Sequence, residues 1–224
     1  MAARAFVWLG GALFVVALAW CAWWYLFEAG RDRPFGGGGA IAVDTALFTI
    51  FALHHSVFAR DAAKRWLDRI PPNLVRSVYV YAASLLLIFV CVAWRPIGGE
   101  IYRAEGMLEP ALIALQLIGL AVIARSVARI DPLELAGIHP PRSTDGLQTS
   151  GPYRWVRHPL YFGWLLAVFG TPHLTGDRLT FAVISVAYLV TAVLWEERSL
   201  LRVFGDDYGR YQREVRWRII PFIY

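Results

Sequence analysis

Long apolar runs alternate with short polar and basic connections along the whole chain. Six runs can be distinguished, at about 5–27, 40–59, 74–94, 109–128, 159–173 and 179–195. A helix needs about 20 residues to cross a hydrocarbon core of about 30 Å, because each residue adds about 1.5 Å. The first four runs meet this length, but the fifth, with roughly 15 residues, does not. We therefore expect the fifth and sixth runs to form a tilted helical hairpin with its turn at 175–178.

The composition agrees with a membrane protein. Hydrophobic residues make up 58% of the 224 residues and charged residues only 17%, and the mean hydropathy is +0.48. These values exclude an ordinary soluble domain. The sequence predicts an all-α, polytopic membrane bundle of about five to six transmembrane helices. We expect transmembrane helices 1–4, which form the membrane anchor and a pocket, over 1–130, and a ligand-binding region with the helical hairpin and a cytoplasmic tail over 131–224.

The distribution of basic residues predicts the orientation. If the N-terminus lies inside, the inner segments hold 17 of the 22 Lys and Arg residues. Cytoplasmic segments carry such an excess, so both termini are expected in the cytoplasm. The net charge of +5 then reflects topology and attraction to anionic lipid, and no nucleic-acid partner is expected.

No metal site is predicted. Cys21 and Cys91 both fall inside apolar runs, without metal-ligand spacing. His54 and His55 are adjacent, so their side chains point about 100° apart on a helix and do not form an i, i+4 ligand pair. An ionisable residue inside a span still suggests a function, and His55 is the candidate, with a structural hydrogen bond as the alternative.

The segment 151–163 joins a basic stretch to an apolar run. Pro159 suits the first position of a helix, which places His158 at the N-cap. The amides of Leu160 and Tyr161 would then be free, beside the side chains of Arg157 and His158. This arrangement predicts an anion site. The alternative is that Arg157 and His158 only mark the cytoplasmic end of a helix.

Two adjacent carboxylates, Glu196 and Glu197, end the sixth run. Either they reach water or pair with neighbouring arginines, or they act with the anion site on one ligand. A ligand with a carboxylate and a fixed positive charge would meet Arg157 and His158 at one end and the glutamates at the other. Gly205 is expected to end this helix, and the amphipathic tail 215–224 to fold back as a lid.

An ordered set of motifs in the last 75 or so residues resembles the isoprenylcysteine carboxyl methyltransferase and phospholipid methyltransferase superfamily. The set comprises Gly151-x-Tyr153-x-x-Val156-Arg157-His158-Pro159-x-Tyr161-x-Gly163, Glu196-Glu197-x-x-Leu200, Gly205-x-x-Tyr208-x-x-Tyr211 and Ile219-x-Pro221. The resemblance implies an enzyme that uses S-adenosyl-L-methionine. It also implies cofactor-binding roles for Tyr153, Arg157, His158, Tyr161, Glu196 and Glu197.

The amino-terminal half is similar to the bacterial methanethiol S-methyltransferases. The similarity rests on His55-Ser56-Val57-x-Ala59-Arg60, Arg76-Ser77-x-Tyr79-Val80 and Trp94-Arg95-Pro96-Ile97. Those proteins tend to carry Gln, Met and Thr at His54, Phe58 and Val78. The match is therefore partial, and it implies either a small thiol or a lipid or prenylcysteine acceptor.

With a methyl donor implied, we expect the acceptor pocket where the second and third spans meet. His55, Arg60, Arg76 and Tyr79 would converge beneath the cofactor's methyl group. His55 would accept a thiol proton, and Arg60 or Arg76 would favour the resulting anion. Glu197, His55 and Arg76 are therefore the candidate catalytic residues. Glu197 would hold the cationic part of the cofactor, and Glu196 is the second candidate for that role.

Two other families share parts of the pattern. Membrane sterol reductases, which use NADPH, resemble the Arg157-His158-Pro159 segment, the two glutamates and the end of the chain. Haem-containing carotene isomerases resemble the amino-terminal half and use a histidine inside a span as a ligand. The sequence leaves the acceptor and the oligomeric state open.

Overall fold

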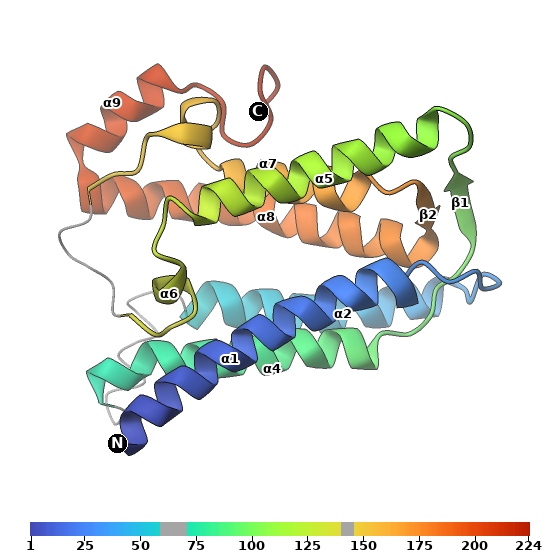
Figure 1. Cartoon of the computed structure of the whole chain (residues 1–224), viewed down its shortest axis with the longest axis horizontal. Coiled ribbons are helices and arrows are strands. Elements are labelled where there is room, and N and C mark those ends of the chain that lie inside the picture. The colour runs from blue at the N-terminus through green and yellow to red at the C-terminus, as the bar shows by residue number, and fades with distance from the viewer. Residues whose placement is uncertain (59–70, 140–145) are drawn as a thin grey trace. The chain divides into compact units, whose positions relative to one another are not determined.

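The protein is almost entirely helical, as the computed structural model shows for residues 1–58, 71–139 and 146–224 (Figure 1). The all-α prediction is confirmed. The elements in chain order are α1 (Ala2–Trp23), its π-helical continuation η1 (Trp24–Glu28), α2 (Gly38–Phe58), α4 (Pro72–Ala93), β1 (Glu100–Arg103), α5 (Leu108–Val127), α6 (Pro132–Leu135), η3 (Gly151–Arg154), α7 (Pro159–Phe169), β2 (His173–Thr175), α8 (Gly176–Phe204) and α9 (Asp206–Glu214). The strands β1 and β2 form a two-stranded sheet.

Among the residues that the structure describes, four helices are long and apolar enough to cross a membrane. They are Ala2–Glu28, Leu74–Ala93, Leu108–Val127 and Gly176–Phe204. Large apolar side chains stay exposed along them, for example Leu117 at 59% and Phe89 at 55%. Such surfaces are rare on soluble monomers but suit contact with lipid, so this is a membrane protein. The predicted run 40–59 forms α2, which is not among the four and carries Asp44, His54 and His55.

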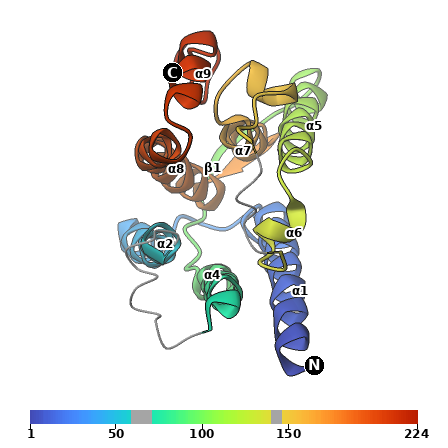
Figure 2. The ribbon, with the colours of Figure 1, turned by 90° about the vertical axis from the view of Figure 1, so that its left-hand side faces the viewer.

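Contacts divide the chain into two compact units, each described by itself. Unit 1 consists of Met1–Gly99, Pro132–Arg142 and Thr175–Asp177. Its helices α1 and α2 both pack against α4 (Figure 2). The hydroxyl of Ser77 on α4 donates to the carbonyl of Gly137 at 3.0 Å. Gly137 has a φ of +72°, and a Cβ there would lie 2.8 Å from Val80, so only glycine fits this close approach.

The buried carboxylate of Asp177 holds the chain segment that follows α4. It accepts hydrogen bonds from Trp94 Nε1 at 2.8 Å and from the amides of Ile97 and Gly98 at 2.9 and 2.8 Å. These donors replace the water that the carboxylate loses on burial. Asp177 lies in the first turn of α8, which begins at Gly176. The predicted turn at 175–178 is therefore wrong, because residues 176–178 already belong to α8 and Asp177 binds the segment that follows α4.

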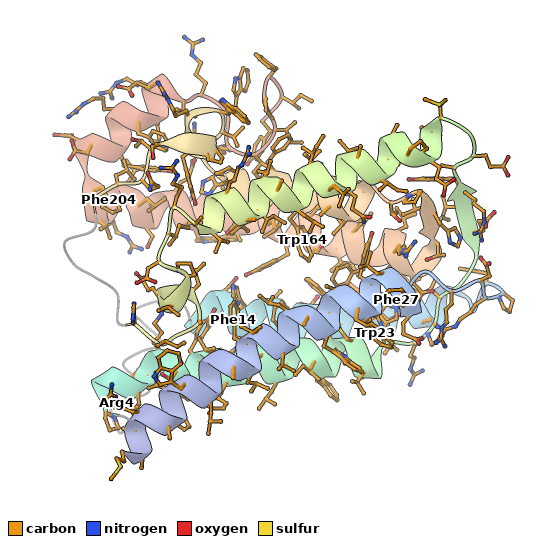
Figure 3. The ribbon with its side chains drawn as sticks, in the orientation of Figure 1. Arg4, Phe14, Trp23, Phe27, Trp164 and Phe204 are labelled. Atoms are coloured by element: carbon orange, nitrogen blue, oxygen red, sulfur yellow. The ribbon has the colours of Figure 1, made fainter. Side chains whose placement is uncertain are left out.

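Unit 2 consists of Glu100–Asp131, Ser143–Leu174 and Arg178–Tyr224. Its helices α5 and α7 pack closely, because a Cβ on Gly119 would lie 2.6 Å from the carbonyl oxygen of Gly163. Trp164 on α7, marked in Figure 3, donates its indole N–H to the hydroxyl of Ser185 on α8 at 3.0 Å. With 11 residues, α7 is about 16 Å long and too short to cross a bilayer, as predicted.

Candidate cofactor site

The site is organised around the start of α7. The helix begins at Pro159 with His158 at the N-cap, which confirms the prediction from the Pro159 rule. The prediction that the amide of Tyr161 is free is wrong, because this amide donates to the carbonyl of His158 at 3.1 Å. The amides of Arg157 and His158 donate to the carbonyls of Trp217 and Arg218 in the tail, at 2.9 and 2.8 Å. The tail therefore folds back onto the helix start.

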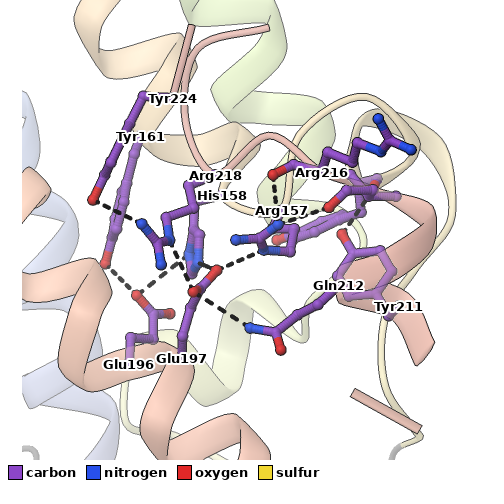
Figure 4. Close-up of polar contacts among 12 residues, drawn as sticks. Arg157, His158, Tyr161, Glu196, Glu197, Tyr211, Gln212, Arg216, Arg218 and Tyr224 are labelled. Atoms are coloured by element: carbon purple, nitrogen blue, oxygen red, sulfur yellow. Dashed lines mark hydrogen bonds and ion pairs between the residues drawn. The ribbon is translucent and has the colours of Figure 1, made fainter. Parts of the chain in front are cut away.

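An ion cluster lies against this helix start, drawn in Figure 4. Arg157 donates from Nε to Oε1 of Glu197 at 2.6 Å, and Arg218 donates from Nε to Oε2 of the same carboxylate at 3.0 Å. The side chains of Arg157 and Glu197 are each only 6% exposed. The hydrogen bond from Arg218 to Glu197 raises the pKa of Arg218 further above its usual range. The sequence placed Arg157 and Glu197 at opposite ends of a ligand, whereas the fold joins them directly.

The same cluster fixes the C-terminal tail. Arg157 Nη1 donates to the carbonyls of Val215 and Arg216 at 2.7 and 2.8 Å. The guanidinium of Arg218 lies over the ring of Tyr224, 5.2 Å from its centroid. A buried charge pair is costly to form and costlier to break, since loss of one partner leaves the other uncompensated. The tail is thus tied to α7 and α8 by charge and by backbone hydrogen bonds.

Glu196, next to Glu197, has different surroundings. Its side chain is 44% exposed, and no arginine pairs with it among the residues that the structure describes. The hydroxyl of Tyr161 donates to its Oε2 at 2.7 Å, and Nδ1 of His158 lies 3.5 Å from the same oxygen. The rings of His158 and Tyr161 stack with their centroids 5.5 Å apart and their planes at 13°, so both lie on the same side of the start of α7. Glu196 is therefore a carboxylate open to an external cation.

The length of α8 explains where this pair lies. The helix has 29 residues and is about 43 Å long, more than the hydrocarbon core of about 30 Å. Glu196 and Glu197 follow the first 20 residues, so the helix has risen about 30 Å where they begin. Charged side chains at that depth meet the interface rather than the hydrocarbon, which makes them tolerable in a spanning helix.

Three tyrosines support the site from outside the spans. Tyr211 donates its hydroxyl to the carbonyl of Tyr153 at 2.6 Å and links α9 to η3. Burial, and after it the carboxylate of Glu196, raises the pKa of Tyr153 to about 12. Burial also raises the pKa of Tyr208, whose hydroxyl lies near Glu197 without a hydrogen-bonding partner at proper distance in the described structure. All three therefore stay neutral near pH 7.

Sequence reasoning missed two members of the cluster. Arg218 was seen only as part of an amphipathic tail, and Gln212, whose amide lies 3.4 Å from Oε2 of Glu197, was not singled out. The available signal was the fold-back prediction for 215–224, which brings a third cation to the glutamates.

The structure brings only some of the predicted acceptor residues together. Tyr79 and His55 meet, with the Tyr79 hydroxyl 2.8 Å from Nδ1 of His55 and 3.3 Å from the His55 carbonyl. Arg76 turns to α6 and donates from Nε to the carbonyl of Glu134 at 2.7 Å. Arg60 lies outside the described residues. Convergence of all four beneath a cofactor stays a prediction.

Comparison with known proteins gives matches over most of the chain. Residues 111–207 match the family model described as phospholipid methyltransferase. The chain is 37% identical over 191 residues to the methanethiol S-methyltransferase of Mycobacterium tuberculosis, covering 80% of this chain and 77% of the relative. It is also 37% identical over 191 residues to methanethiol S-methyltransferase 2 of Bradyrhizobium diazoefficiens, covering 81% of this chain and 74% of the relative. To the methanethiol S-methyltransferase of Pseudomonas deceptionensis it is 34% identical over 186 residues, covering 79% of this chain and 71% of the relative. No solved structure matches the chain.

Proposed function

Because this chain belongs to the methanethiol S-methyltransferase family, we propose that it transfers a methyl group from S-adenosyl-L-methionine to a small apolar thiol. It is a membrane methyltransferase by its family and its apolar helices. The relatives do not favour an NADPH-dependent reductase or a haem-dependent isomerase. We place the chain in a bacterial inner membrane, as the bacterial relatives suggest, with the cofactor site and both termini on the cytoplasmic face. The positive-inside pattern supports this orientation.

The observation that carries the cofactor assignment is the open carboxylate of Glu196. S-adenosyl-L-methionine supplies an electrophilic methyl group on a positively charged sulfur. Glu196 suits that charge because Tyr161 orients it and no arginine neutralises it in the described chain. Nε2 of His158 is buried, and its nearest carboxylate oxygen is 3.5 Å away, so it still has hydrogen-bonding capacity for a ligand.

The two glutamates then have separate roles. We assign Glu196, His158, Tyr161 and Tyr153 to holding the cofactor, and this reverses the order that the sequence suggested for the glutamates. Glu197 and Arg157 act as positioning residues, because they neutralise each other and hold the tail against the helix start. Arg218 completes this support from the tail.

The chemistry on the acceptor side is simple. The thiol loses its proton to a base, the thiolate forms a new S–C bond with the methyl carbon, and the donor sulfur leaves as a neutral thioether. Since a sulfonium is already a good leaving group, positioning and exclusion of water supply most of the rate. His55 is the proposed base, with Tyr79 fixing its ring and Arg60 or Arg76 favouring the thiolate.

The purified protein in detergent should methylate methanethiol to dimethyl sulfide with labelled S-adenosyl-L-methionine. Prenylcysteine, whose carboxylate needs no base, is the competing acceptor. Binding of S-adenosylhomocysteine by titration calorimetry should accompany the activity. Binding of NADPH without S-adenosylhomocysteine would rule the proposal out.

His55→Ala should lower thiol methylation by roughly 100-fold or more, the usual contribution of a positioned base. Tyr79→Phe serves as the matched change, because it removes only the hydroxyl that contacts His55. It should slow the reaction less and shift the pH profile of kcat/KM. If both variants methylated the thiol at the native rate, His55 would be a structural residue and not the base.

A further inference from the structure

The C-terminal tail and η3 enclose a hollow of about 470 Å³, which we call the tail hollow. Its lining includes the exposed arginines Arg154 and Arg216 and the aromatic residues Trp155 and Phe222. Neither arginine forms an ion pair with a described residue, although Glu214 is also at the lining. The tail hollow therefore combines unused positive charge with aromatic surface.

Apolar side chains project beside these charges. Phe222 is 84% exposed, Ile223 76% and Trp155 66%. Phe222 has a φ of +67°, which no other described residue except glycine shows as a positive value. A bulky residue is unfavourable in that conformation, so the loop carries strain that a glycine would avoid. This strained conformation exposes the Phe222 ring, whose centroid lies 5.7 Å from that of Trp217 in a tilted arrangement.

This loop is rigidly presented rather than loose. The amide of Ile219 donates to the carbonyl of Tyr224 at 2.9 Å, and the amide of Tyr224 donates to the carbonyl of Ile220 at 3.0 Å. On the other side, η3 contacts α5, a helix long enough to span the membrane. A Cβ on Gly151, the first residue of η3, would lie 3.2 Å from Arg129, two residues past the end of α5. The tail hollow therefore lies in unit 2 near the end of a span, where lipid headgroups are expected.

We propose that the tail hollow binds the headgroup of an anionic phospholipid. Arg154 and Arg216 would contact the phosphate, while Phe222, Ile223 and Trp155 enter the boundary between headgroups and acyl chains. Aromatic residues next to basic ones are favoured at this depth. The proposal does not depend on the identity of the methyl acceptor. Its rival is that the tail hollow holds part of the cofactor.

The test is lipid retention measured by native mass spectrometry. The full-length protein is released from nanodiscs of phosphatidylglycerol or of phosphatidylcholine, and bound lipid is counted. We expect selective retention of phosphatidylglycerol, reduced roughly fivefold by Arg154→Gln or Arg216→Gln and roughly thirtyfold by both. Arg210→Gln is the matched control, because Arg210 is an exposed arginine on α9 that pairs with Asp207 outside the tail hollow.

Phe222→Gly separates membrane contact from packing. It removes the ring and relieves the positive φ, so the melting temperature in detergent should hold or rise while phosphatidylglycerol retention falls. A lower melting temperature with unchanged retention would mean that the ring serves internal packing, and would overturn the proposal.

Two further results would also overturn it. Equal loss of lipid in the Arg210→Gln control would mean that only general surface charge attracts the lipid. A fall in S-adenosylhomocysteine affinity in lipid-free detergent for the Arg154 and Arg216 variants, without loss of lipid, would place the cofactor in the tail hollow.

Discussion

Replacing Glu197 by alanine should destabilise the protein and release its C-terminal tail. The change leaves Arg157 buried at 8% exposure without its partner, and breaking a buried pair costs about 3–5 kcal/mol. For a chain of 224 residues this corresponds to a fall in melting temperature of roughly 6–20 °C. Trypsin should also cut after Arg218 faster than in the native protein, because Glu197 no longer holds that side chain.

Glu196→Ala is the matched control for this experiment. Its carboxylate is partly exposed and pairs with no arginine in the described residues, so stability should change by no more than about 1 kcal/mol. A double-mutant cycle of Arg157→Ala with Glu197→Ala should give a combined cost well below the sum. Additive costs, or equal effects of the two glutamates, would contradict the positioning role of Glu197.

Replacing Glu196 by glutamine should weaken binding of S-adenosyl-L-methionine by roughly 10- to 150-fold. This is the range for losing a charge-assisted contact of about 1.5–3 kcal/mol. S-adenosylhomocysteine lacks the sulfonium charge, so its affinity should change much less. Titration calorimetry with both ligands on the same preparation measures the difference.

Tyr161→Phe is the companion variant, since it removes the hydroxyl that orients Glu196 but no charge. Because Glu196 keeps its charge and loses only its orientation, we expect a smaller effect, roughly 2- to 13-fold weaker binding for about 0.5–1.5 kcal/mol. If Glu196→Gln weakened both ligands equally, the carboxylate would hold the amino group that they share and not the sulfonium. Unchanged binding of both would remove Glu196 from the cofactor site.

Element boundaries were predictable where local rules act alone. The start of α7 at Pro159 and the end of α8 before Gly205, whose φ is +52°, follow from the geometry of those residue types. The start of α8 was not predictable. Asp177 binds groups about 80 residues earlier in the chain, and no pattern within 175–178 reveals that partner.

By itself, the sequence determined that this is an all-α membrane protein and which residue types meet at the start of α7, where we propose the cofactor site, because hydrophobic runs, N-cap rules and an ordered motif set are local properties. The roles of Glu196 and Glu197 were decided only by the tertiary structure. Neighbours on a helix point about 100° apart, so one of the two must turn inward, and the sequence does not say which. The folded tail brings Arg218 to the same carboxylate as Arg157, and that makes Glu197 the buried partner and leaves Glu196 open.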